Sequence, residues 1–441
     1  MGLAWESGLS QPIGGVNKAL AEVELENTTE RFLPQFLGGM GELYTSVFEP
    51  RKPVKIYAGV PTSQLQFSGL TNKAAQIDMR AKQVRLEAAD YMEFFQNKYL
   101  DTTTLYTGVT TDFILDRLLL SAGLTTAQYV LETGQSTIGF AMLESGAKFS
   151  DVINQLVQAE NGQFYVDENG IYRFENRLHY AVDPYRAVNY TAEPNMVINA
   201  QAPSTDHLIN VVEFNYNPRK KTSSTTIFTL SGTIAVPTGD SEVFIDFDNP
   251  VLSASAPSYT VNSLEDGTGS NLTANVTIKA TALFAQSVKY TFTNSGAAGF
   301  FTSMTIQGRW AILRYATPQY YRLKDDSSVT AYQEQVLSIN NDYIQDQVWA
   351  NSFGQLILSD FSEPEKILTL TIRAIPGLRR GHLVVYNQYS WRIYRIRSTL
   401  DPSYGYIQEL TMMQRGPASG SGVTYFQVGV TPLDDIAVIA P

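Results

Sequence analysis

The sequence contains no cysteine and only three histidines. Without cysteine, the chain forms no disulfide, holds no zinc through a thiolate and has no thiol nucleophile, as is common for proteins made in a reducing cytoplasm. The histidines, His179, His207 and His382, lie far apart, and no HExxH or paired-histidine pattern occurs. These absences exclude cysteine peptidases and amidases and argue against a zinc peptidase.

Long apolar runs are also missing. No window of about 18 apolar residues occurs, so we expect no membrane span. The first residues, MGLAWESGLSQPIGG, lack a basic region followed by an apolar run, so we expect no signal peptide. The net charge of −11 repels phosphate at long range and argues against tight nucleic-acid binding, although it allows DNA to slide past without sticking.

The composition is that of a globular protein. The 441 residues are 44% apolar and 17% charged, enough for about two to four domains with their own cores. Aromatic and β-branched residues are abundant, and Gly, Asn, Asp and Ser recur between short runs. This pattern predicts a chain that is mainly β, with a few helices.

The first hundred residues predict a β-rich unit. One strand alternates over 19–25 and closes in a polar turn and Pro34, and another reaches Gly59. The next strands are marked by Phe67 and Gly69 and by the alternating Val84, Leu86 and Ala88, after which Asp90 is expected to open a helix.

A small α/β module is predicted over 104–186. One helix starts at Thr111 and Asp112 and ends at Gly123, and a second runs from Ser150 to Gly162. A hairpin follows, with Asn169 and Gly170 at its turn.

The remaining chain predicts further β structure. A strand over 207–221 leads into a Ser/Thr/Gly/Asn-rich stretch, 222–333, whose evenly spaced strands suggest a β-sandwich or barrel insertion. Asn340, Asn341 and Asp342 are expected to cap a helix with a buried stripe, weakened by Gly354, of Ile344, Val348, Leu356 and Phe361. Several strong strands and then a GPASGSG linker before a last short strand complete the chain.

Four phrases, in this order, resemble the hub proteins of tailed-bacteriophage tail tips and baseplates. They are LAEVELENTTERFLPQF; PVKIYAG followed by LQFSG; the helices and hairpin from FILDRLLLSAGL to YRF with the strand LINVVEF; and the stretch from KILTLTIRAI to RIRSTLD. Together they span about residues 15–415.

The resemblance implies a fold and a set of domains. The expected fold is mainly β with α+β parts: two tail-tube-like β-barrel domains, a small α/β module and a β-sandwich or barrel insertion. The expected domains are 1–103, the first tube-like barrel; 104–186, the α/β module; 187–221, strands returning to the tube-like domains; 222–333, the insertion; 334–415, the second barrel; and 416–441, the linker and C-terminal strand.

The resemblance also implies a structural function. Hubs of this family are homotrimers whose pseudo-sixfold ring joins the hexameric tail tube to a threefold tip or fibre and frames a DNA channel. The implied partners are the distal tail or tail tube protein, the tape-measure protein and a tip fibre or spike, and DNA passes without specific binding. The expected place is the virion tail tip or baseplate, and the family implies no catalytic residue, cofactor or metal.

Two other functions stay open. A lysozyme-like cell-wall hydrolase needs only two carboxylates, for which Glu160 with Asp167 or Asp325 with Asp326 can be nominated, although acidic residues beside turns are more often solvated. A receptor-binding or carbohydrate-binding tail protein would use the segment 222–333.

Several smaller motifs have a functional and a structural interpretation. Asp246, Asp248 and Asn249 resemble a cation-binding loop, although one face of a strand explains the spacing as well. The basic runs 219–221 (Arg219, Lys220, Lys221) and 379–380 (Arg379, Arg380) are candidate contacts for DNA or an acidic subunit, and more often are solvated. The aromatic segments SYGYIQ and QYSWRIYRIR fit sugar stacking, but more often form sheet packing or a subunit interface.

Overall fold

The computed structural model describes most of the chain. The described residues are 2–8, 14–29, 32, 50–59, 63–73, 75–179, 197–201, 208–216, 218–312, 319–363, 367–386, 389–401 and 405–417. Pro34, the residues after Pro417 and His207 lie outside them, so the polar turn at Pro34 and the C-terminal strand stay predictions. Within the described part of the chain, every helix is too short or too polar to cross a membrane.

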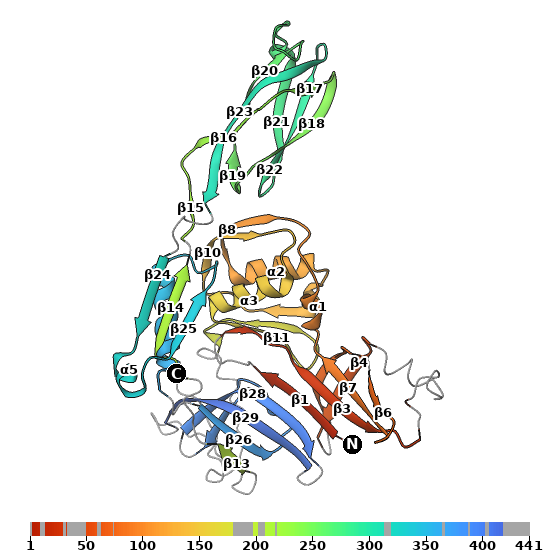
Figure 1. Ribbon diagram of the computed structural model, residues 1–441, viewed down its shortest axis with the longest axis vertical. Helices are drawn as coiled ribbons and strands as arrows, with labels where there is room; N and C mark the ends of the chain where they lie inside the picture. Colours follow the sequence, from red (N-terminus) through yellow and green to blue (C-terminus); the bar gives the residue numbers. More distant parts are fainter. Residues whose placement is uncertain are drawn as a thin grey trace.

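The largest element is an 11-stranded sheet with the order β13-β26-β29-β28-β1-β3-β7-β5-β4 (Figure 1). We call its N-terminal half the first β-unit; its strands are β1 (Gly2–Gly8), β3 (Leu20–Glu26), β4 (Pro53–Ala58), β5 (Gln64–Thr71), β6 (Gln76–Asp78) and β7 (Gln83–Ala89). The other half is the second β-unit; its strands are β13 (Val197–Gln201), β26 (Ile367–Arg373), β27 (Leu383–Tyr386), β28 (Tyr389–Asp401) and β29 (Gly405–Pro417).

The two β-units are continuous through one strand pair. β1 runs antiparallel to β28, from Leu3 opposite Leu400 to Gly8 opposite Arg395. The Arg395 guanidinium also donates to Glu6 across this pair, at 2.8 Å. Each half keeps its own core, one around Trp5 and the other around Trp391. The parts expected as two tube-like domains therefore share one sheet.

The middle module combines helices and short strands. Its elements are β2 (Gly15–Val16), α1 (Glu93–Gln96), β8 (Thr104–Thr110), α2 (Thr111–Ser121), the 3-10 turn η3 (Thr126–Gln128), β9 (Tyr129–Leu131), β10 (Thr137–Leu143), α3 (Phe149–Glu160), β11 (Gln163–Val166) and β12 (Tyr172–Glu175). Both long helices and the β11–β12 hairpin confirm the sequence predictions. The helix expected at Asp90 begins only at Glu93 and is four residues long.

Local chemistry explains where the helices end. α2 buries Ile114, Leu115, Leu118 and Leu119 on one face, as the apolar spacing predicts. α3 ends at Asn161, whose φ of 53° is left-handed. The Asn161 side chain accepts a hydrogen bond from the Gly14 backbone N–H at 2.9 Å, so the end of α3 also fixes the segment leading into β2.

A three-stranded side sheet, β24-β14-β25, packs beside the middle module (Figure 1). It comprises β14 (Val211–Tyr216), β24 (Gln319–Lys324) and β25 (Val336–Asn340), with α5 (Asp326–Tyr332) and α6 (Gln347–Phe361) attached. Buried residues of β14, β25 and α6 share one core with those of α2 and α3. The structure therefore assigns 319–333 to this sheet and not to the insertion, and 336–361 to the middle module's core and not to a second barrel.

Details of α6 and β14 correct the sequence predictions. The α6 cap is Asp346, which accepts from the Trp349 N–H at 2.7 Å, and Val348 is 77% exposed rather than buried. A Cβ at Gly354 would lie 2.4 Å from Leu323 Cδ1, so this glycine permits close contact between α6 and β24. The regular part of the strand expected over 207–221 is β14, which buries the face of Val212, Phe214 and Tyr216 and leaves the other face partly exposed at Glu213 and Asn215.

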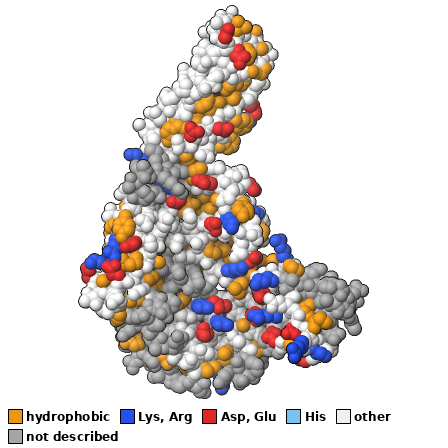
Figure 2. Space-filling model, viewed as in Figure 1, with side chains coloured by type: hydrophobic (Ala, Val, Ile, Leu, Met, Phe, Trp, Pro, Cys, Tyr) orange, Lys and Arg blue, Asp and Glu red, His pale blue; other side chains and the backbone are white. Residues whose placement is uncertain are grey.

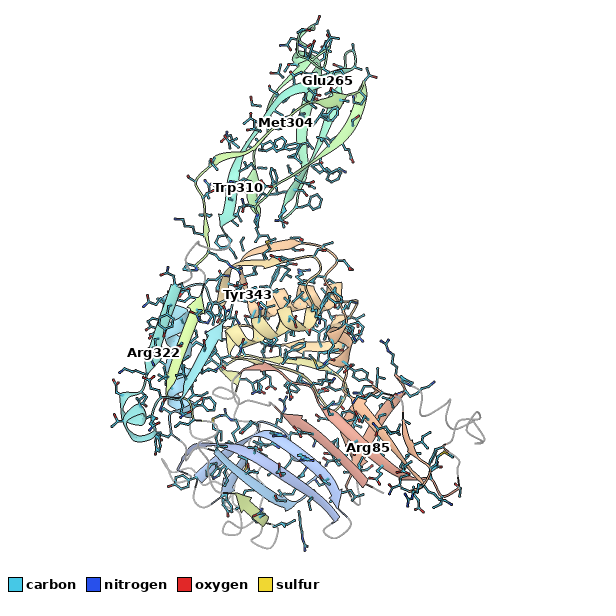
Figure 3. The ribbon with its side chains drawn as sticks, viewed as in Figure 1. Arg85, Glu265, Met304, Trp310, Arg322 and Tyr343 are labelled. Atoms are coloured by element: carbon cyan, nitrogen blue, oxygen red, sulfur yellow. The ribbon has the colours of Figure 1, made fainter. Side chains whose placement is uncertain are left out.

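The insertion is a β-sandwich that projects from the rest of the molecule (Figure 1). Its strands are β15 (Lys220–Lys221), β16 (Thr225–Thr229), β17 (Ile234–Val236), β18 (Gly239–Asp246), β19 (Val251–Ala254), β20 (Ser258–Asn262), β21 (Val276–Leu283), β22 (Ser287–Asn294) and β23 (Gly299–Ile312), with the 3-10 turn η7 (Thr273–Asn275). β18-β22-β21 forms one sheet and β23 with its partners the other. The separate core includes Tyr290, Phe301 and Met304; Figure 3 shows Met304 between Glu265 at the far end and Trp310 near the base.

For the chain as a whole, the prediction of a mainly β fold with α+β parts is confirmed.

Candidate functional site

A cavity of about 290 Å³ lies where the two β-units meet the middle module. Trp5 and Phe67 of the first β-unit and Leu378 and Ile396 of the second line it with apolar surface. The β11–β12 hairpin, residues 165–169, supplies polar lining. We call it the junction cavity. Because three separate parts of the chain form its wall, any change in their relative placement changes its shape.

Arg379, in the loop between β26 and β27, connects all three parts. Its Nε donates to Glu168 of the hairpin at 3.0 Å. Its Nη1 donates to the Gln66 side chain at 3.3 Å, and its Nη2 donates to the Leu65 carbonyl at 3.2 Å, both in the first β-unit. The planar guanidinium offers five donors in a fixed fork, a geometry that suits one side chain binding several acceptors. Arg379 therefore links its loop in the second β-unit to the hairpin and to the first β-unit, and we call this set of contacts the clasp.

Arg380 lies deeper, at 8% exposure. Its guanidinium carbon stands 3.7 Å from the centre of the Tyr165 ring, a cation–π contact. Nη1 donates to the Gln163 side chain at 3.3 Å. Nη2 is buried, and among the described residues it has no hydrogen-bond partner. The more common solvated interpretation of this basic pair is therefore wrong, since Arg379 and Arg380 hold the junction together.

Asp90 lines the same cavity from the end of β7 and is 3% exposed. Its carboxylate accepts from the Ala19 N–H at 2.7 Å and from the Met92 N–H at 3.0 Å, which ties the start of β3 to the end of β7. Burial raises the pKa of Asp90 to about 7, because the two hydrogen bonds and the charges of Lys18 and Arg380 offset only part of the desolvation. This carboxyl therefore titrates near neutral pH.

Asp167 shapes the hairpin that faces the cavity. Its carboxylate accepts from the Asn169 and Ile171 N–H groups at 2.9 and 3.0 Å, and from Arg173 Nε at 2.7 Å. Gly170 adopts a φ of +84°, and a Cβ there would lie 2.8 Å from the Tyr91 ring. The turn expected at Asn169 and Gly170 is confirmed, and it needs glycine for both conformation and space.

The carboxylates nominated for hydrolysis have structural roles. Glu160, fully buried, accepts from the Gln135 and Ser136 N–H groups at 3.0 and 2.9 Å and so holds the loop before β10. Asp325 accepts from the first N–H groups of α5 as its N-cap. Asp326 pairs with Lys324 at 2.6 Å. The view that acids beside turns are solvated is wrong for Glu160 and Asp167, which are buried and bind different partners.

The residues of the candidate cation loop lie at the end of β18 and directly after it. Asp246 is the last residue of β18, and Asp246, Asp248 and Asn249 are all exposed. In the part of the chain that the structure describes, no group of three or more His, Cys, Asp and Glu side chains is placed to hold a metal ion. The strand-face interpretation accounts for this spacing.

The basic run 219–221 divides between two environments. Arg219 donates to the Phe140 carbonyl of β10, and its guanidinium lies 5.8 Å from the Tyr343 ring centre. Figure 3 shows Tyr343 in the body below the insertion. Lys220 and Lys221 pair with the end of β23 and are exposed. Arg219 thus anchors the base of the insertion, which corrects the solvated interpretation for that residue.

The aromatic segments of the second β-unit contribute to sheet packing. Trp391 is buried and donates from its indole N–H to the Tyr386 carbonyl at 3.0 Å. The Tyr406 ring lies 5.4 Å from that of Trp5 on the first β-unit.

Of the histidines, His179 contacts Glu132, whereas the His382 ring accepts from the Arg379 N–H at 3.1 Å.

Most of the junction has no signal in the sequence. The local pattern marks Asp90 only as a helix start, and nothing in it distinguishes Gln66, Tyr165 and Glu168. The one available signal was the adjacent pair Arg379 and Arg380 in a short loop. Nothing local in the sequence indicates that three distant segments bury that pair.

Comparisons with known proteins give distant structural neighbours but no family. No family model and no curated protein matches the chain. A 43 kDa tail protein of prophage MuSo2 from Shewanella oneidensis is similar at 9% identity, with 93% of each chain covered and a TM-score of 0.49. A tail protein from Neisseria meningitidis MC58 is similar at 9% identity, with 94% of this chain and 92% of that one covered and a TM-score of 0.47.

A type VI secretion component, the E. coli c3393 protein, is similar at 7% identity, with 96% of this chain and 75% of that chain covered and a TM-score of 0.39. It is described as structurally similar to the T4 bacteriophage tail proteins gp27 and gp5. At such low identities and TM-scores, the similarity assigns no activity, partner or assembly to this chain.

Proposed function

We propose that this protein is the structural hub of a phage tail tip or baseplate. Three copies form a pseudo-sixfold ring that joins a hexameric tail tube to a threefold tip or fibre and frames the DNA channel. The order of the four sequence phrases supports this function, as does the presence of two β-units, a middle module and an insertion in one chain.

The single observation that carries the proposal is the sheet shared by the two β-units. Because β1 pairs with β28, each subunit presents two β-units side by side, and three subunits present six. Within the described residues, the end strands β4 and β13 each pair on one side only. An edge strand offers unpaired N–H and C=O groups to another chain, and head-to-tail contacts of this kind close into rings.

The proposed ring works by geometry and has no catalytic step. The tube protein and a distal tail protein contact one side, and the tip fibre or spike contacts the other. The tape-measure protein and then DNA pass through the channel, and a net charge of −11 favours passage without adhesion. A zymogram on peptidoglycan tests the absence of hydrolysis, and clearing by the purified chain would count against a purely structural hub.

Light scattering on the full-length chain across a concentration series tests the assembly. We expect a mass of about 147 kDa, three times the 48.9 kDa of one chain. Charged residues on strand edges block edge pairing, so Ile198→Lys in β13 and Tyr57→Lys in β4 should shift the mass toward one subunit. Val348→Lys, at an exposed apolar position on α6, is the matched control. Edge variants that remain trimers would reject these strands as the interface.

A second candidate function, carbohydrate or receptor binding, is favoured by one face of the insertion. Phe244 and Phe284 are both about half exposed, and their rings stack at 6.5 Å between centroids. Leu283, which precedes Phe284 in the sequence, is also exposed, and Figure 2 shows hydrophobic side chains along one side of the insertion. Glycan-array binding by the full chain that Phe244→Ala and Phe284→Ala abolish would support this function; an array without signal would remove it.

A further inference from the structure

The junction cavity contains an unusual cation. The Nε of Arg173 donates a hydrogen bond to Asp167. The Arg379 guanidinium donates to Glu168, Gln66 and three carbonyl groups. Arg380 instead stacks on a ring, uses Nη1 on a neutral amide and, among the described residues, leaves Nη2 buried with no partner. A buried charged donor without an acceptor costs stability, so such a group needs an explanation.

The surroundings of Arg380 have the size and chemistry of a small binding site. The cavity is partly open to solvent, and about 290 Å³ accommodates several water-sized groups beside a ligand. Ser7 and Ser68 line it from the first β-unit, and their hydroxyl groups are donors. Apolar side chains, Trp5, Phe67 and Leu378, form the rest of the wall near them.

We propose that the junction cavity binds a small oxyanion, a carboxylate or a phosphate group, at the guanidinium of Arg380, which lines it. Arginine is suited to this role because its planar fork matches the oxygens of carboxylate and phosphate. The bound oxyanion lies between Arg380 of the second β-unit and the serine hydroxyls of the first. It therefore strengthens the contact between the two β-units, in addition to the clasp made by Arg379.

Asp90 makes the binding depend on pH. Its carboxylate lies in the same cavity and interacts electrostatically with Arg380, and its pKa is raised to about 7 by burial. When ionised, Asp90 repels a bound anion and competes for Arg380; when neutral, it does neither. The other charged or titratable groups around Asp90 and the cavity are Lys18, Asp167, Glu168, Tyr165, Tyr172, Arg173, Arg379 and His382.

The experiment is calorimetric titration of the full-length protein with sodium acetate and, separately, with sodium phosphate, against sodium chloride at equal ionic strength. We expect saturable binding of at least one anion, at least tenfold weaker in Arg380→Gln and partly recovered in Arg380→Lys. Arg85→Gln, which removes an exposed surface guanidinium (Figure 3), should bind as the unmutated chain does. Acetate alone identifies a carboxylate site and phosphate alone a phosphate site. No saturable binding of either anion, or equal binding by Arg380→Gln, overturns the proposal.

A second measurement does not depend on the folding of an Arg380 variant. Acetate stays fully ionised between pH 6 and pH 8, so its titration reports on the protein's groups. We expect several-fold weaker binding at pH 8 than at pH 6, and a smaller difference in Asp90→Asn. His382 also lines the cavity, and the Asp90→Asn comparison separates the effect of Asp90 from any effect of His382. Acetate that binds equally at both pH values lies elsewhere, which overturns the assignment to this cavity.

Discussion

Replacing Arg379 with alanine should weaken the junction selectively. The side chain makes contacts to Glu168, Gln66 and Leu65 outside its own loop. Hydrogen bonds to charged groups contribute about 1.5–3 kcal/mol each when buried, but the side chains of Arg379 and Glu168 are 27% and 30% exposed, so their contact is discounted as a near-surface ion pair. The expected loss is therefore about 2–4 kcal/mol of free energy of unfolding, spread over three contacts.

Urea unfolding measures the total loss, and amide hydrogen exchange locates it. Exchange should accelerate in β5, in the β11–β12 hairpin and in the loop after β26, and should change little in the insertion, which has its own core. Arg379→Lys should recover little, because an ammonium lacks the guanidinium fork. Arg85→Ala, at a largely exposed ion pair on β7 (Figure 3), is the control. The clasp is refuted if Arg379→Ala unfolds at the same urea midpoint as Arg85→Ala.

Three further outcomes follow from the structure. The raised pKa of Asp90 means that the folded state holds this proton more tightly than the unfolded state, so stability should fall as pH rises from about 4 to about 7 and then level off; Asp90→Asn should flatten the slope in urea midpoints measured at each pH. Gly69→Ala should lower the melting temperature by several degrees, because its Cβ would lie 2.2 Å from the Ala89 carbonyl oxygen, whereas Gly15→Ala has room; equal effects would contradict the packing. Replacing 222–310 with a short Gly/Ser linker should leave the body folded by circular dichroism, since the two ends meet through a 3.0 Å backbone hydrogen bond; loss of the body would show that the sandwich is needed.

Local patterns in the sequence determine the parts that were predicted well. The spacing of Ile114, Leu115, Leu118 and Leu119 is a property of one helix, and the Asn169 and Gly170 turn is a property of one hairpin. The sandwich follows from repeated short strands in the insertion. In each case, the residues that decide the structure lie within a few turns or strands of one another.

The sequence could not predict features that depend on distant segments. β1 and β28 are almost the whole chain apart, and no motif in either strand specifies the other. Val348 fits an apolar stripe by spacing, but α6 begins one residue before it and leaves the side chain in solvent. From the sequence alone, Arg380 fits an exposed turn. In the folded chain, the first β-unit and the hairpin bury it.

Electron-microscopy averages of the purified full-length assembly, viewed along its symmetry axis, test the central claim most directly. We expect a ring of six similar lobes around an open centre, with three projections where the insertions extend from the body. Three copies would then supply two β-units each. A particle without a central opening, or a ring in which each subunit contributes a single lobe, would contradict the proposed hub.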